Sequence, residues 1–81
     1  MSYRIAYTNE ARSGLDTLSV PARKDFNTRI ADIARNPYGC GSTAVRGDRE
    51  RRDAAIGHIA IIRYEVSPSV VTVTVLRVIS L

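Results

Sequence analysis

The 81-residue sequence has a single cysteine, Cys40, a single histidine, His58, and no tryptophan. One cysteine excludes an internal disulfide, and one cysteine with one histidine is too small a set for a structural zinc site. No segment approaches the ~20 apolar residues that a membrane-spanning helix needs, and the N-terminus lacks the apolar stretch of a secretion signal. We therefore expect one small domain, residues 1–81, without metal or cofactor, not associated with a membrane, in a reducing compartment such as the cytoplasm.

Positive charge exceeds negative charge, with twelve Lys+Arg against eight Asp+Glu and a formal net charge of +4. Lys24 is the only lysine, and arginine suits planar, bidentate contacts with phosphate or carboxylate groups. A compositional bias of the lineage explains the arginines equally well. Because bases and acids are spread evenly along the chain, the sequence permits a polyanionic or acidic partner without demanding one.

The first half of the chain predicts one strand followed by two helices. Residues 2–8 alternate in polarity and predict a strand. Thr8 or Asn9 can cap a helix, which Gly14 weakens. The Ser-Val-Pro segment at 19–21 joins this helix to a second, amphipathic helix that an Asn-Pro pair ends.

The second half predicts three strands, over residues 52–57, 58–66 and 70–79. The last of them is so rich in valine that we expect a central strand buried on both faces. The element order is β-α-α-β-β-β. This order predicts an α+β fold, with a helical hairpin packed on one face of a mainly antiparallel sheet and the other face open.

Four stretches occur in a characteristic order and spacing: the opening YRIAYTNEAR, the end of the second helix at ARNPYG, the V-R-G-D turn, and an R-Y-E-V strand followed by a valine-rich strand. Together they resemble the RelE/ParE superfamily of toxins from bacterial type II toxin–antitoxin systems. The resemblance covers nearly all of the chain. It implies a RelE-like fold with two helices against a curved sheet, and neutralisation by a cognate antitoxin protein, with a homodimer or a toxin–antitoxin hetero-oligomer both open.

The resemblance leaves two activities open, because the fold alone does not choose between them. RelE-like members cleave mRNA in the ribosomal A site without a metal, and ParE-like members poison DNA gyrase. Metal-free cleavage needs the 2′-hydroxyl placed in line with the phosphorus, positive charge around the phosphate and a proton donor for the leaving oxygen. Under the RelE-like hypothesis we assign catalysis to Arg63, Arg77 and Arg52. We assign contacts with RNA or a protein partner to Arg46, Arg49, Arg51 and His58.

The sequence departs from the family pattern at two places. Ile61 stands where the family commonly has an arginine, and Arg63 is the nearest substitute, on the same side of an extended strand as Ile61 and Ile59. The alternative is that Arg63 only pairs with Glu65 or with a neighbouring strand. At residues 79–81 the family usually has further basic residues and often a tyrosine. These departures favour the alternative function, a ParE-like gyrase-binding toxin or a member that retains only antitoxin or partner binding.

The segment RGDRERRD at residues 46–53 carries four arginines but only one net positive charge, which is poor for a pure phosphate cradle. In an extended chain Arg49 and Arg51 share one side, and Arg52 lies on the other. The open question is whether Arg51 and Arg52 face the same hollow as Arg63.

Three further side chains have simpler interpretations. We expect Tyr64 to point into the core beside Ile62 and Val66, and Tyr38 to be available for contacts. Cys40 has no basic partner nearby in the sequence, so a thiol nucleophile is not expected there.

Overall fold

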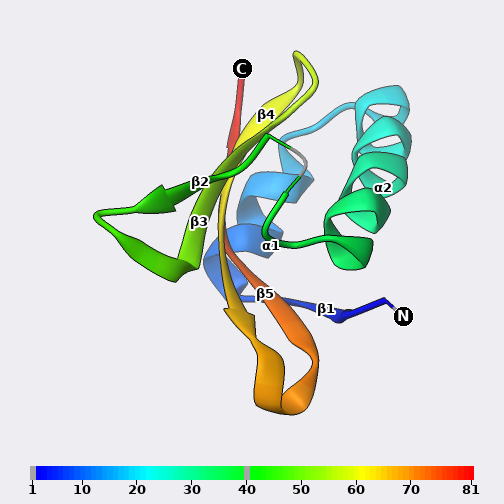
Figure 1. The fold of residues 1–81 in the computed structure, drawn as a ribbon. Helices are drawn as coiled ribbons and strands as arrows, with labels where there is room; N and C mark the ends of the chain where they lie inside the picture. Colours follow the sequence, from blue (N-terminus) through cyan, green and yellow to red (C-terminus); the bar gives the residue numbers. More distant parts are fainter. Residues whose placement is uncertain (1, 40) are drawn as a thin grey trace.

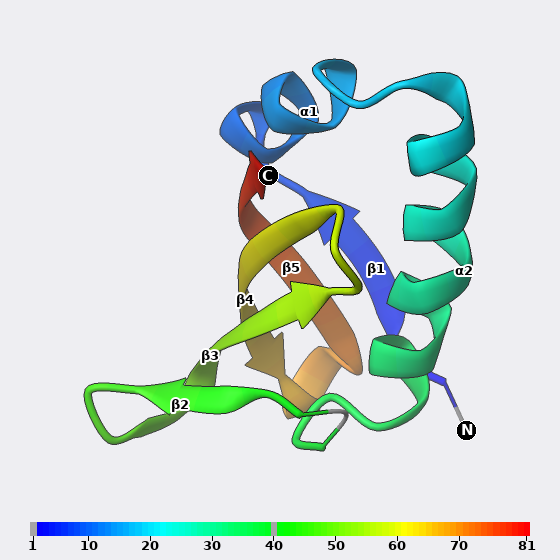
Figure 2. The same ribbon diagram turned by 90° about the horizontal axis from the view of Figure 1, so that it is seen from above.

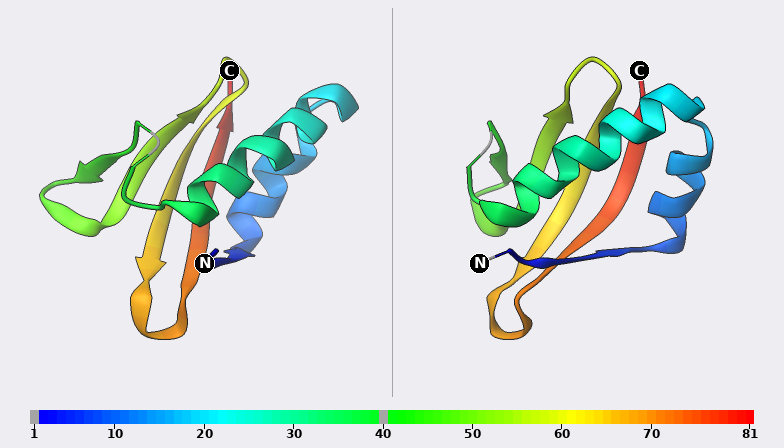
Figure 3. Two further views of the ribbon diagram at one scale, coloured as in Figure 1. Left: turned by 45° about the vertical axis from the view of Figure 1, so that its right-hand side comes forward. Right: turned by 90° about the vertical axis from the view of Figure 1, so that its right-hand side faces the viewer.

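The computed structural model describes residues 2–39 and 41–81 and places two helices on one face of a five-stranded sheet (Figure 1). The elements in chain order are β1 (Arg4–Tyr7), α1 (Asn9–Asp16), α2 (Val20–Arg35), β2 (Thr43–Val45), β3 (Asp48–Ile56), β4 (Ala60–Ser67), the 3-10 turn η1 (Pro68–Val70) and β5 (Thr72–Ser80). The sheet order is β1-β5-β4-β3-β2, with β1 and β5 parallel and the other pairs antiparallel. Figure 3 shows both helices on the same side of a twisted sheet whose opposite side is uncovered. The predicted α+β fold is confirmed.

Each helix begins at a residue whose hydroxyl accepts a backbone hydrogen bond. Thr8 Oγ1 accepts from the Ala11 amide at 3.1 Å, and Ser19 Oγ accepts from the Ala22 amide at 3.3 Å, which satisfies donors that a helix start leaves free. Thr8 Oγ1 also donates to the Leu76 carbonyl at 2.8 Å, so it attaches the start of α1 to β5. Among the described residues, none belongs to a helix both long and apolar enough to cross a membrane.

Gly14 lets α1 lie directly against β5. A Cβ at this position would be 2.2 Å from the Val78 carbonyl oxygen, which is closer than any side chain allows. The glycine that weakens the helix is therefore required by the packing of the helix on the sheet.

The valine-rich strand β5 lies between β1 and β4, so the predicted central position is confirmed. The predicted burial on both faces is wrong. Val73 and Val75 are fully buried on the side that the helices cover, whereas Arg77 and Ile79 are exposed on the other side. The helices cover only one face, so β5 has only one face in the core.

Tyr64 is fully buried within the hydrophobic core, as predicted. Its hydroxyl donates a 2.6 Å hydrogen bond to the Pro37 carbonyl. This bond satisfies a polar group that burial would otherwise penalise, and it fixes the chain after α2 against β4.

The β2–β3 hairpin extends the sheet beyond the sequence prediction. A strand was predicted only from residue 52, but β3 begins at Asp48 and pairs with β2, which was not predicted. The two loop residues, Arg46 and Gly47, have φ of 53° and 79°, as a tight two-residue type I′ hairpin requires. Figures 1 and 2 show this hairpin projecting away from the helices.

Candidate functional site

The site is built on the face of the sheet opposite the helices, which we call the open face. Charged side chains of neighbouring strands lie in register there. Arg51 is opposite Glu65, Asp53 is opposite Arg63, and Arg63 is also opposite Arg77 on its other side. The sheet register therefore brings together arginines that are far apart in the sequence.

Arg63 forms a bidentate ion pair with Asp53 on the neighbouring strand. Arg63 Nε is 2.8 Å from Asp53 Oδ1, and Arg63 Nη2 is 3.0 Å from Asp53 Oδ2. These hydrogen bonds hold the pKa of Asp53 below its usual range and raise the pKa of Arg63. Pairing of Arg63 with a neighbouring strand was one of the two alternatives considered from the sequence, and the strand concerned is β3.

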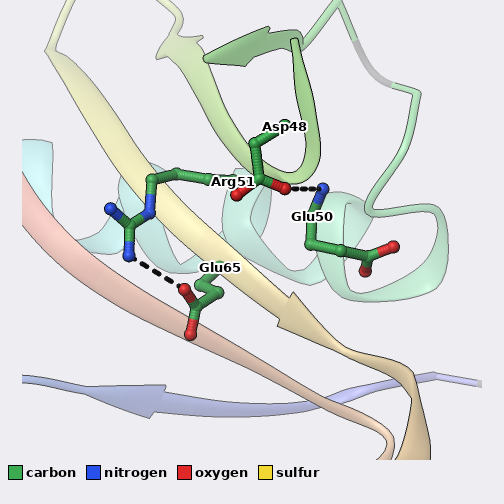
Figure 4. Close-up of polar contacts among 4 residues, drawn as sticks. All are labelled: Asp48, Glu50, Arg51 and Glu65. Carbon is green, nitrogen blue, oxygen red and sulfur yellow. Dashed lines mark hydrogen bonds and ion pairs between the residues drawn. The ribbon is translucent and has the colours of Figure 1, made fainter. Parts of the chain in front are cut away.

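Arg51 pairs with Glu65, with Nη2 3.0 Å from Oε2. In Figure 4 these two side chains point toward each other from β3 and β4, while the Glu50 side chain points away from them. Asp48 Oδ1 accepts a hydrogen bond from the Glu50 amide at 3.0 Å, close to the hairpin turn (Figure 4). Arg51 therefore shares the open face with Arg63.

Arg77 pairs across to the first helix, with Nη2 3.5 Å from Glu10 Oε1. Like Arg51 and Arg63, its side chain is about half exposed. Ion pairs at this exposure stabilise a fold by only ~0.2–1 kcal/mol each. The three arginines are thus held by contacts weak enough to be exchanged for another anion.

Arg52 lies on the opposite side of β3 and does not face the same hollow as Arg63. Its side chain is buried, with 9% of the residue exposed. Its Nε donates to Ser42 Oγ at 2.8 Å, and its two terminal nitrogens donate to the carbonyls of Ser42 and Arg49 at 3.2 and 3.0 Å. These bonds fasten the segment before β2 to β3, so the catalytic assignment of Arg52 has no support from its position.

Arg49 and Arg51, predicted to lie on one side of an extended chain, have different partners. The Arg49 guanidinium lies over the Tyr38 ring, 4.3 Å from its centroid, and the Tyr38 hydroxyl donates to Glu50 Oε2 at 2.7 Å. Partial burial, followed by the hydrogen bond and negative charge of Glu50, raises the pKa of Tyr38 to about 12. Tyr38, predicted to be available for contacts, is partly buried in this cluster.

Two shallow hollows meet at Arg63 on the open face. The smaller, of about 80 Å³, is lined by Asp53, Ile61, Ile62, Arg63, Arg77 and Ile79. The larger, of about 230 Å³, is lined by Val45, Arg46, Asp48, Arg51 and Arg63. Ile61 and Ile79 are cross-strand partners with exposed fractions of 43% and 49%, whereas Ile59, which was expected to share this face, packs against the core. Both hollows thus combine charged side chains with apolar ones.

The structure places the predicted site residues in three locations. Arg46, Arg51, Arg63 and Arg77 line the two hollows. Arg52 and Arg49 take part in the contacts with Ser42 and Tyr38, and His58 is exposed in the turn after β3, at the other end of that strand from Arg46. Cys40 lies outside the described residues. Among the residues that the structure describes, no group of three or more His, Cys, Asp or Glu side chains is placed to hold a metal ion.

Sequence reasoning missed Asp53 and Glu10 as partners of the open-face arginines, and it named Glu65 only as a partner of Arg63. Asp53, Glu65 and Glu10 each pair with an arginine from another element. Only the strand register and the position of α1 bring them together, and neither can be read from local sequence. Knowledge of the β3–β4 register would have revealed the pairs of Asp53 and Glu65.

No protein-family model matches the chain, and no curated protein matches it in sequence. Solved structures do match. A chain of the RelBE2 toxin–antitoxin complex of Mycobacterium tuberculosis superposes with a TM-score of 0.82 and 23% identity, covering 100% of both chains. The isolated RelE toxin of E. coli gives 0.80 and 16% over 98% of this chain and 84% of that one, and the YoeB/ParE toxin of Agrobacterium tumefaciens gives 0.76 and 18% over 96% and 98%. The chain therefore has the fold of the RelE/ParE superfamily of toxins.

Proposed function

We propose that this protein is the toxin of a type II toxin–antitoxin system, a RelE-like ribosome-dependent mRNA endonuclease that acts in the cytoplasm and is neutralised by a cognate antitoxin. The observation that carries the proposal is the alignment of Arg51, Arg63 and Arg77 on the uncovered face of a RelE-like sheet. RelBE complexes from three organisms are among the matching solved structures, which supports an antitoxin as the partner.

In this proposal the arginines contribute charge and position. Arg63 and Arg77 flank the smaller hollow, where their guanidinium groups bind the scissile phosphate and stabilise the charge that develops on it. Arg46 and Arg51, at the larger hollow, bind an adjacent phosphate and keep the RNA strand in register. Arg52 acts indirectly, because it holds the segment before β2 in place.

A second candidate function follows from the chemistry of the open face. Arginine does not release a proton near neutral pH, and His58 lies beyond the far end of β3. Among the described residues of the two hollows, none is therefore suited to protonate the leaving oxygen. This observation favours a toxin that acts by binding, such as a ParE-like inhibitor of DNA gyrase, or a member that retains only antitoxin binding.

Expression in a bacterium, with and without a candidate antitoxin gene, tests the proposal. We expect growth arrest with mRNA cleaved on ribosomes, relieved by the antitoxin. Arg63→Ala combined with Arg77→Ala should abolish the arrest. The matched control, Arg29→Ala with Arg35→Ala, removes the same charge from exposed positions on α2 and should leave the arrest intact.

The other outcomes separate the alternatives. Growth arrest with DNA damage and intact mRNA would contradict the endonuclease hypothesis and support the gyrase-binding hypothesis. If the Arg63/Arg77 double variant still arrests growth fully, the open face is not the site of the toxic activity. Absence of arrest with soluble protein present would leave only the antitoxin-binding function, which co-purification with the candidate antitoxin would then test.

A further inference from the structure

Four charged residues form a row in the order Asp53, Arg63, Arg77, Glu10. The first three lie on neighbouring strands of the open face, and Glu10 reaches Arg77 from α1. Arg63 and Arg77 are direct cross-strand partners on β4 and β5. Like charges directly opposite each other on neighbouring strands are unfavourable. The row therefore places two positive charges in the middle and one negative charge at each end.

The two acids hold the two arginines from opposite sides. Asp53 on β3 binds the Arg63 guanidinium through two hydrogen bonds of 2.8 and 3.0 Å, and Glu10 on α1 binds Arg77 at 3.5 Å. The smaller hollow includes both arginines in its lining, with the exposed side chains of Ile61 and Ile79 beside them. An anion seated there would meet two guanidinium groups and would relieve their mutual repulsion.

We propose that Asp53 and Glu10 compete with the RNA phosphate for Arg63 and Arg77, which they occupy in the free protein, and so set the affinity of the open face for RNA. The inference rests on the proposed function. When a phosphodiester binds, each arginine leaves its carboxylate partner and binds a phosphate oxygen instead. All four side chains are exposed enough for this exchange. Both acids are affinity-determining residues that act through the arginines and need not touch the RNA.

The two competitors differ in strength. The Asp53 pair is bidentate and lies in register on adjacent strands, whereas the Glu10 pair is a single, longer contact between a helix and a strand. A bidentate pair is the stronger of the two geometries. Neutralising Asp53 should therefore increase RNA affinity more than neutralising Glu10.

The experiment measures binding of a short fluorescein-labelled single-stranded RNA by fluorescence anisotropy at fixed salt. We expect Asp53→Asn to tighten binding roughly 1.5- to 5-fold, and Glu10→Gln to tighten it less. Asp25→Asn is the charge-matched control, because Asp25 is an exposed acid paired with Arg29 on α2, outside the open face. A final arm places Asp53→Asn in an Arg63→Gln background, where the gain should disappear.

Each outcome decides between specific possibilities. An equal gain for Asp53→Asn and Asp25→Asn, or a gain that persists without Arg63, would show that only net charge matters and would overturn the inference. RNA binding that falls with Arg63→Gln but does not change with Asp53→Asn would overturn the inference and leave the proposed function standing. Failure of the parent protein and of every variant to bind RNA would overturn the inference, while the growth-arrest experiment would still decide the proposed function.

Discussion

Tyr38 contacts three side chains just after the end of α2. The Arg49 guanidinium lies over its ring, 4.3 Å from the centroid, and that of Arg52 lies 5.8 Å from the centroid. The Tyr38 hydroxyl donates a hydrogen bond to Glu50 Oε2 at 2.7 Å. Cation–π contacts and a charge-assisted hydrogen bond reinforce each other here. This single residue therefore connects the segment after α2 to β3.

The raised pKa of Tyr38 predicts a loss of stability in alkali. The pKa rises from 10.0 to about 12 on folding, so the folded protein keeps the phenol protonated where the unfolded chain ionises. The stabilising contribution of the protonated Tyr38 hydroxyl is complete below pH 10.0 and disappears as the pH rises through about 12. Tyr38→Phe should reduce the fall in unfolding free energy over this range, measured by urea denaturation at a series of pH values. An identical fall in the variant and the parent protein would contradict the assignment.

Arg51 and Arg52 show what sequence can and cannot predict for single residues. Strand alternation correctly separates the two side chains onto opposite faces, but it does not say which face is covered by helices. That depends on the packing of α1 and α2. Nor does the sequence reveal that Ser42, ten residues earlier, supplies two acceptors that make burial of Arg52 possible. A buried arginine and an exposed one look alike in a charged segment.

At the scale of elements, the contact between α1 and β5 depends on the absence of a side chain at Gly14. Helix propensity alone would favour alanine at this position by ~1 kcal/mol. The packing opposes it, because an alanine Cβ would collide with the Val78 backbone. The steric term dominates, since backbone atoms in a central strand cannot move aside easily.

Gly14→Ala should therefore destabilise the protein by ~1–3 kcal/mol, the usual cost of overpacking. Urea denaturation measures the change. Ser13→Ala is the matched control, because Ser13 is the preceding helical residue and is exposed, so this variant should be neutral or slightly stabilising. Equal effects of the two substitutions would show that α1 can move away from β5 at little cost.

Elements differ in how well sequence predicts them. Capping residues, Thr8 or Asn9 for the first helix and Ser19 for the second, together with regular apolar spacing, were enough to predict both helices. The start of β3 was missed because residues 48–51 contain no apolar alternation. These residues become strand through pairing with β2, the Arg46-Gly47 turn and the bonds of Arg52, all of which are tertiary or depend on backbone conformation.

At the scale of the whole molecule, the net charge of +4 overstates the unpaired positive charge of the open face. Arg51, Arg63 and Arg77 are each neutralised by a carboxylate of the same chain. Composition reports the sum of charges, and only the fold determines how they are paired. The family resemblance predicted the fold correctly but could not predict these pairs.

The salt dependence of RNA binding tests how much of the molecule takes part. Four arginines line the two hollows, and each phosphate contact with a single strand contributes a slope of ~0.7 in log K against log salt. We expect a total slope no steeper than about −3, measured by anisotropy over a series of KCl concentrations. A steeper slope would show that arginines on the helices also contact RNA. Arg29→Ala with Arg35→Ala should leave the slope unchanged.

The parallel pairing of β1 with β5 has a consequence for synthesis of the chain. Residues 4–7 find their sheet partners only at residues 72–75, so closing the sheet requires a contact across most of the sequence, which is slow to form compared with local hairpins. On a translating ribosome β1 and both helices emerge long before the central strand that they cover. Until residue 75 has left the exit tunnel, the apolar faces of α1 and α2 have no finished sheet to pack against, and the open face does not exist.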